Sequence, residues 1–179
     1  MMEKPYLNNN TKLDEQALQK AFIYNLNKIH PVLLHLSTHL PCLADKSCYG
    51  DLENAITELS AEVKVHVTRL NIIFEILSTT PSNKNSSVII RTLNVLLPDK
   101  NDYLLDNLSK DLNLVFHIQK ILSIKKYYYA ILKSIAGSLN NIGIKQYLQY
   151  NCDDCESNQN MFKLIAKEYM DSSIDQFLS

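Results

Sequence analysis

The chain has 179 residues, enough for one domain that buries a hydrophobic core of its own. Its 18 Lys and Arg residues are balanced by 19 Asp and Glu residues, so no net positive charge attracts it to nucleic acid or to anionic lipid. Its apolar runs are far shorter than the roughly 20 residues of a membrane span, and residues 1–10 are polar, so we expect a cytoplasmic protein that binds neither nucleic acid nor membranes.

The first predicted helix runs from Asp14 to about Leu43. Its apolar residues recur at spacings of three and four, which places them on one buried stripe of a helix. This stripe consists of Leu18, Phe22, Leu26, Ile29, Leu33, Leu36 and Leu40. Pro31 lies inside the helix and lacks a backbone donor, which predicts a kink or a local break. Pro41 and the polar residues 45–47 predict the end of the helix.

The second predicted helix starts at Asp51, a suitable N-cap, and ends before Pro81. Its inward stripe consists of Leu52, Ile56, Leu59, Glu62, His66, Leu70, Ile73 and Leu77. Two members of this stripe are polar, although burying a polar group costs free energy unless it finds a partner. The apolar residues 86–97, closed by Pro98, predict a short connecting helix across one end of the molecule.

Two further helices are predicted in the second half of the chain. The third starts with Asp102 as its cap and ends near residues 140–143. Its stripe consists of Leu105, Leu108, Leu112, Val115, Leu122, Lys125, Tyr129, Leu132 and Ala136. The fourth runs from about Ile142 to Met170 and is followed by a short amphipathic tail from Ser172. Its stripe consists of Leu148, Cys152, Cys155, Gln159, Phe162 and Ile165.

Four long helices, with one longer link between the second and the third, predict an all-α protein with an antiparallel four-helix bundle. With only three glycines and five prolines, the chain offers no linker between independent domains. We therefore expect a flexible N-terminus over residues 1–12, the bundle over 13–171, and a short C-terminal helix or tail over 172–179.

Polar side chains at inward positions mark the place where chemistry is possible. They are Glu62, His66, Lys125, Cys155 and Gln159. Carboxylates and histidines from facing helices at mid-length are the means by which a bundle builds a dinuclear iron or manganese site. Glu62 and His66 are four residues apart and share one helix face, which suits two ligands of one metal.

Several segments carry a resemblance to a known family. They are Phe22 to Leu26, Leu36, Leu40 and Pro41, Glu62 to Leu70, Phe74 to Leu77, Pro81, Gln119 and Lys120, Tyr129, Leu132, Asp153 and Asp154, and Phe162. In these segments the chain resembles the bacterial ferritin-like stress-response family typified by YciF and YciE, over residues 20–170 and most specifically in the second helix. The resemblance implies a ferritin-like bundle, usually a homodimer, with a dinuclear metal centre built from acidic residues on all four helices and a histidine on the second.

Only Glu62 and His66 match the metal ligands that this resemblance implies. The other positions correspond to Leu33, Leu122, Lys125, Cys155 and Gln159. Two divalent ions need several carboxylates to balance their charge, so we expect a degenerate site that holds no metal and no cofactor. The ammonium of Lys125 could instead pair with Glu62 and replace the lost cation, or Lys125 could extend to the surface while Tyr129 fills the gap.

Other metal or redox motifs are weak. His35 and His39 have the spacing of metal ligands, but no carboxylate accompanies them. Cys152 and Cys155 form a C-x-x-C pattern inside a helix without a second such pattern, so we favour buried, reduced thiols over a zinc site. The run 127–129 of three tyrosines points in three directions and most simply packs core, interface and surface.

These observations favour a non-enzymatic, metal-free protein of the ferritin-like stress type that acts through self-association, as a homodimer, or through a protein partner. The alternative is a metalloprotein with an altered iron or zinc site made by Glu62, His66 and Cys155 with help from Asp154. No glycine-rich phosphate loop and no positioned serine nucleophile support nucleotide binding or hydrolysis. A helical toxin, effector or secretion adaptor is also compatible with the Asn- and Lys-rich composition.

Overall fold

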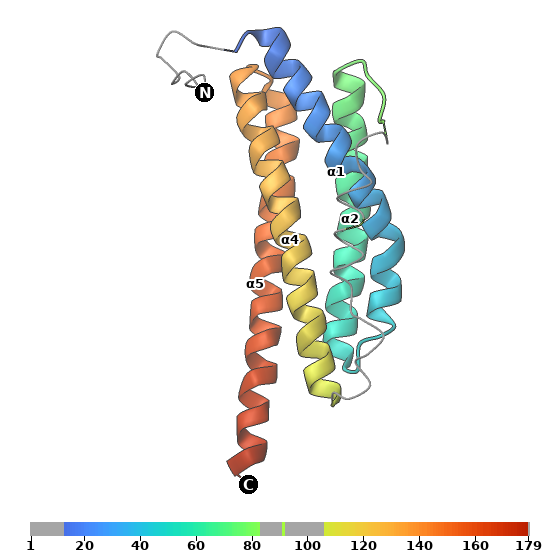
Figure 1. The fold of residues 1–179 in the computed structure, drawn as a ribbon, viewed down its shortest axis with the longest axis vertical. Helices are drawn as coiled ribbons and strands as arrows, with labels where there is room; N and C mark the ends of the chain where they lie inside the picture. Colours follow the sequence, from blue (N-terminus) through green and yellow to red (C-terminus); the bar gives the residue numbers. More distant parts are fainter. Residues whose placement is uncertain (1–12, 83–90, 92–105, 179) are drawn as a thin grey trace, which may run out of the picture.

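The computed structural model describes residues 13–82, 91 and 106–178, and of residues 172–178 it describes the backbone only. In these residues it contains four long helices and no strand: α1 (Glu15–Ala44), α2 (Gly50–Ile76), α4 (Asn107–Ser138) and α5 (Ile142–Leu178). Figure 1 shows that α1 and α2 form one antiparallel pair and α4 and α5 another. The two pairs pack through α1 on α4 and α2 on α5. The predicted all-α four-helix bundle is therefore confirmed.

The link between α2 and α4 joins opposite ends of the bundle, since α2 and α4 run in the same direction (Figure 1). The predicted short connecting helix over residues 86–97 lies, except for Arg91, outside the described residues.

The core is made by the apolar stripes predicted for the four helices. Its largest fully buried side chains include Tyr129, Phe22, Phe74, Phe162 and Leu26. Residues three and four apart along a helix share one face, which lets each helix bury a continuous row against its neighbours. Each fully buried side chain of this size stabilises the fold by roughly 2 to 3 kcal/mol relative to an exposed one.

Helix α1 is continuous from Glu15 to Ala44, so neither Pro31 nor Pro41 interrupts it. The helix starts where expected, because the Asp14 side chain accepts a hydrogen bond from the Ala17 amide at 2.6 Å. Figure 1 shows that the course of α1 bends part-way along its length. A bend without a break is the milder of the two expected outcomes, and a proline within a helix causes it by removing one hydrogen bond.

Helix α2 does not start at the predicted N-cap, Asp51. Its N-cap is Tyr49, which makes no capping hydrogen bond with its side chain, and Asp51 lies in the first turn. The carboxylate of Asp111, from α4, instead accepts hydrogen bonds from the amides of Cys48 at 2.8 Å and Tyr49 at 3.0 Å. Asp111 is buried, and its charge lies where the helix dipole favours an anion.

Helices α4 and α5 also differ from the predicted boundaries. The N-cap of α4 is Asp106, whose side chain accepts from the Ser109 amide at 2.8 Å, while the predicted cap Asp102 lies outside the described residues. Helix α5 is one element through Leu178, so the tail expected from Ser172 continues the helix without a break.

Replacing Asp111 with alanine should reduce the free energy of unfolding by about 2 to 3 kcal/mol. The backbone amides of Cys48 and Tyr49 would lose their acceptor, and the N-terminus of α2 would lose its compensating charge. Urea denaturation followed by circular dichroism measures this. Asp51→Ala is the matched control, with an expected loss below about 0.5 kcal/mol because Asp51 is exposed. Equal losses in the two variants would contradict the role of Asp111.

Candidate functional site

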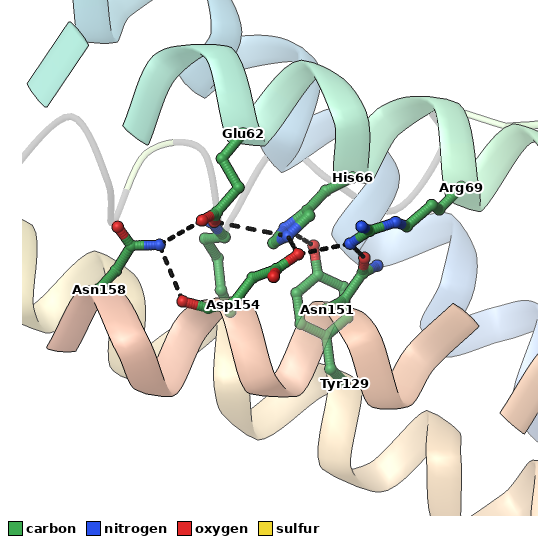
Figure 2. A network of polar contacts seen from close by, with 8 residues as sticks. Glu62, His66, Arg69, Tyr129, Asn151, Asp154 and Asn158 are labelled. Carbon is green, nitrogen blue, oxygen red and sulfur yellow. Dashed lines mark hydrogen bonds and ion pairs between the residues drawn. The ribbon is translucent and has the colours of Figure 1, made fainter. Parts of the chain in front are cut away.

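A cluster of polar side chains lies between α2 and α5, midway along the bundle. Figure 2 shows Glu62, His66 and Arg69 projecting from α2 towards Asn151, Asp154 and Asn158 of α5, with Tyr129 of α4 reaching His66 from a third side. These seven residues and Lys125 of α4 are called the central cluster below. Their spacings of three and four along each helix place them on facing sides of α2 and α5.

His66 is the buried centre of this cluster. Its Nε2 lies 3.1 Å from Asp154 Oδ2, and its Nδ1 lies 3.1 Å from the hydroxyl of Tyr129. A carboxylate only accepts hydrogen bonds, so we assign the ring proton to Nε2, which donates to Asp154. The Tyr129 hydroxyl then donates to Nδ1. Burial raises the pKa of Tyr129 well above its usual value, so this hydroxyl keeps its proton.

His66 is neutral in this setting. Burial first, and then the nearby cations Lys125 and Arg69, lower the pKa of His66 to about 2. The carboxylates beside its ring do not reverse this shift, because each of them already has a cationic partner.

Asp154 is held by an arginine from the facing helix. Arg69 Nη1 donates to Asp154 Oδ2 at 2.5 Å and to Asn151 Oδ1 at 2.9 Å. The guanidinium also lies over the ring of Tyr150, 5.6 Å from its centroid. Two hydrogen bonds and one aromatic face therefore fix the position of this cation.

Glu62 has a buried cation as its partner. Lys125 is fully buried, and its Nζ lies 3.8 Å from Glu62 Oε1. The other oxygen of Glu62 accepts a hydrogen bond from Asn158 at 2.5 Å. Burial raises the pKa of the Glu62 carboxyl, and Lys125 and Asn158 oppose this rise. The pair between Lys125 and Glu62 predicted from the sequence is present, and the alternative in which Lys125 extends to the surface is wrong.

Two carboxylates and two cations give the central cluster no net charge while His66 is neutral. A charge taken out of water costs several kcal/mol unless an opposite charge and hydrogen bonds compensate it. Here Glu62 pairs with Lys125, and Asp154 pairs with Arg69. The cluster therefore balances its charges with its own side chains.

The positions that the resemblance assigned to lost metal ligands lie in different surroundings. Leu33, Leu122 and Cys155 are fully buried, and burial raises the pKa of the Cys155 thiol to about 12, so it stays protonated. Among the described residues, the donor atoms that lie together belong to Glu62, His66 and Asp154, and Cys155 is not one of that group.

Among these positions, the side chain of Gln159 points away from the central cluster. Its side chain donates to Ser123 of α4 at 3.1 Å, and its backbone carbonyl accepts from Gln119 at 2.9 Å. The residue that contacts Glu62 from α5 is Asn158, one position earlier. Asp154 and Asn158, rather than Cys155 and Gln159, thus face α2.

Arg69, Asn151 and Asn158 were not predicted. A spacing signal existed, because Arg69 follows His66 by three residues and the pair 151 and 158 flanks Asp154 at three and four residues. Asn151 and Asn158 are buried and Arg69 is partly buried. They are polar, so the spacing of apolar residues did not mark them.

Three residues of the cluster form a possible metal-binding set. Glu62, His66 and Asp154 each present one donor atom, and these atoms lie within 4.8 Å of one another. Three such donors suit a single zinc or iron ion with an open position, but they are too few for a pair of ions. Glu62 Oε1 accepts no hydrogen bond, which leaves it available to a cation, but the nearest cation is Lys125.

The other candidate motifs do not assemble a site. The rings of His35 and His39 stack with centroids 3.8 Å apart, and His39 Nδ1 donates to the His35 carbonyl at 2.8 Å, so this nitrogen is not free for a metal. All four cysteines are free thiols: Cys42 and Cys48 are exposed, whereas 152 and 155 are buried. Among the described residues, no helix is long and apolar enough to cross a membrane.

No family model matches the chain, and no curated protein sequence matches it. Two solved structures share its fold. The Escherichia coli stress protein YciF aligns with a TM-score of 0.77 and 17% identity, over 86% of this chain and 97% of YciF. YcfI of Rhodopseudomonas palustris aligns with a TM-score of 0.73 and 17% identity, over 88% of this chain and 98% of YcfI. The predicted resemblance to YciF is confirmed for the fold, a ferritin-like four-helix bundle.

The stability of the protein should fall as the pH drops below about 6.5. The pKa of His66 is about 2 in the folded chain and near 6.5 in the unfolded chain, so the unfolded chain binds a proton that the folded chain does not. Its contribution is complete above pH 6.5 and is lost at about 1.4 kcal/mol per pH unit below it.

Urea denaturation between pH 7.5 and 5.0 measures this slope, with His66→Gln as the comparison. Glu62 and the other titrating groups are common to both proteins, so the difference in slope isolates His66. Identical pH slopes in the two proteins would contradict a neutral, buried His66.

Proposed function

We propose that this chain is a non-enzymatic, metal-free protein of the ferritin-like stress type, and that it acts through self-association or by binding a protein partner. The observation that carries the proposal is the buried ammonium of Lys125, 3.8 Å from Glu62 Oε1. It supplies a positive charge in the region of the bundle where ferritin-like proteins hold metal ions between facing helices.

The charge balance supports a metal-free centre. With Lys125 and Arg69 in place, the two carboxylates are already neutralised. A divalent ion would add two positive charges to a largely buried site, and the desolvation of those charges would have no compensating anion. It would also compete with the proton on His66 Nε2 that is donated to Asp154.

The surroundings of the cluster also give no support to catalysis. Two hollows on the surface of the described residues are lined by other side chains and not by Glu62, His66 or Asp154. A buried nucleophile is present in Cys155, but its thiol is protonated. Binding through the helix surfaces is therefore the better supported role.

Helix α4 leaves apolar side chains on its outer face. Phe116 is 47% exposed and Tyr127 is 64% exposed, three helical turns apart. Between them, Lys120, Ser123 and Ile124 help to line a shallow open hollow. Large aromatic side chains of this kind are frequent anchors of protein interfaces, so we propose this face as the contact with a second copy.

A second candidate function is a metalloprotein with one iron or zinc ion. Its support is the set of three donor atoms in Glu62, His66 and Asp154, and the Oε1 of Glu62, which accepts no hydrogen bond. Binding would require the ammonium of Lys125 to move away or lose its proton, and His66 to give up its Nε2 proton.

Elemental analysis of protein purified without chelator separates these two functions. We expect no stoichiometric iron or zinc in the natural chain. Lys125→Glu should bind one zinc or iron ion per chain, because it removes the competing cation and adds a third carboxylate to the donor set. Lys126→Glu is the matched control and should bind none, because Lys126 pairs with Glu156 on the outside of the bundle. One tightly bound ion per natural chain would overturn the metal-free proposal.

Sedimentation equilibrium tests self-association through α4. The natural chain should show twice its monomer mass, and the double variant Phe116→Glu with Tyr127→Glu should raise the dimer dissociation constant more than about tenfold. Val65→Glu is the control, since Val65 is a similarly exposed apolar residue on α2. A dimer that both variants leave intact would show that this face is not the interface, and a natural chain that is monomeric would leave partner binding as the remaining form of the proposal.

A further inference from the structure

Three of the five histidines of the chain belong to the faces along which α1 packs on α4. His35 and His39 lie on α1, His117 lies on α4, and all three side chains are partly buried. The two histidines of α1 do not assemble a site by themselves. A third imidazole from the facing helix changes this, because three nitrogen ligands are enough to hold one transition-metal ion.

The register of α1 against α4 places His39 opposite His117. The two helices are antiparallel neighbours (Figure 1). Burial raises the pKa of Tyr128 of α4, and the nearby ammonium of Lys28 of α1 opposes this rise, so these two side chains meet across the interface. A step of eleven residues, or about three helical turns, leads from Lys28 forward to His39 and from Tyr128 back to His117. The same two helix faces therefore meet again at this pair of histidines.

His35 lies one turn from His39 on the same face of α1. The two imidazole rings stack, with centroids 3.8 Å apart and an angle of 29° between their planes. Nearly parallel rings at this separation present their nitrogens side by side. Two histidines four residues apart on one helix face bind a shared metal ion in this arrangement.

The hydrogen bonds of His39 favour the tautomer that a metal ligand needs. Its Nδ1 lies 2.8 Å from the carbonyl oxygen of His35 and 3.0 Å from Thr38 Oγ1. A carbonyl only accepts, and the Thr38 hydroxyl already donates to the same carbonyl, so we assign the proton of the neutral ring to Nδ1. Nε2 then carries the lone pair. Histidines that bind metals commonly donate their other nitrogen to a backbone carbonyl in this way.

The chemistry of three imidazoles selects the metal. Neutral nitrogen donors suit copper, nickel and zinc, whereas magnesium and calcium prefer oxygen ligands. With one set of nitrogen ligands, the affinity for divalent ions rises through iron, cobalt and nickel to a maximum at copper. Among the described residues, the one group of three donors already within 4.8 Å of one another is that of Glu62, His66 and Asp154, so an ion has to draw the three histidine rings together by rotating them.

We propose that His35, His39 and His117 form a binding site for a copper or nickel ion between α1 and α4. The pair on α1 supplies two nitrogens, His117 supplies the third, and water takes the remaining position. None of these ligands belongs to the central cluster, so the site is independent of the metal-free centre in the proposed function.

Isothermal titration calorimetry of the full chain with Ni²⁺ tests the proposal. Nickel is the probe because the exposed thiols of the chain would reduce Cu²⁺. We expect one ion per chain. His39→Gln and His117→Gln should each weaken binding at least about tenfold, since even the loss of an outer-shell partner costs that much. His30→Gln is the matched control and should leave the affinity unchanged, because this histidine of α1 contacts Asn71 of α2 at 2.8 Å.

Two outcomes of the titration contradict the site. An affinity that His117→Gln leaves unchanged would show that the pair on α1 holds the ion alone. Binding that is lost in His66→Gln and kept in His117→Gln would place the ion in the central cluster. The second outcome would also count against the metal-free centre, whereas the first would not, so the two proposals fail in different ways.

A measurement on the natural chain needs no variant to fold. Paramagnetic Ni²⁺, added below one equivalent, broadens the nuclear magnetic resonance signals of residues close to the ion. We expect the amide signals of His35, His39 and His117 to broaden together. Broadening confined to α1 would reject a site shared by the two helices.

Discussion

The pairing of charges across the middle of the bundle, around the fully buried Lys125, is the constraint on which the arrangement of the four helices depends. Lys125 on α4 cannot reach water and must meet Glu62 on α2, while Asp154 on α5 must meet Arg69 on α2. Each pair joins two helices that are far apart in sequence. A rotation of α4 against α2 would leave the ammonium of Lys125 buried without a partner, at a cost of several kcal/mol, so this pair opposes changes in how the two helices face one another.

Hydrogen bonds extend this constraint to the rest of the centre. Tyr129 and Asp154 hold the two nitrogens of His66, and Asn158 connects Glu62 to the backbone of α5. Each of these side chains satisfies a group that would otherwise be buried without a partner. The centre is therefore a connected polar network without net charge. Such a network is compatible with a scaffold whose role lies on its surface, and the fold it shares with YciF is compatible with several roles.

Much of the candidate site was predictable, and the parts that were not share one cause. Glu62, His66 and Lys125 were identified because a polar side chain interrupts an otherwise apolar stripe, and their pairing followed from charge alone. Gln159 was expected to face the centre of the bundle, but its side chain contacts Ser123 of α4. The residue of α5 that contacts Glu62 is its neighbour Asn158. A shift of one residue turns a side chain by about 100° around the helix axis, so a small error in rotation exchanges one neighbour for another.

The amino-acid sequence by itself determined the four helices and the apolar stripes that each of them buries, because a helical period of 3.6 residues is a local property that spacing reveals. It also showed few acidic residues at inward positions, from which we expect no pair of metal ions. Only the tertiary structure decided that Asp111 of α4 caps α2 and that Arg69 neutralises Asp154. These contacts join residues tens of positions apart, and their partners depend on how each helix is rotated and offset against the next, which local patterns do not specify.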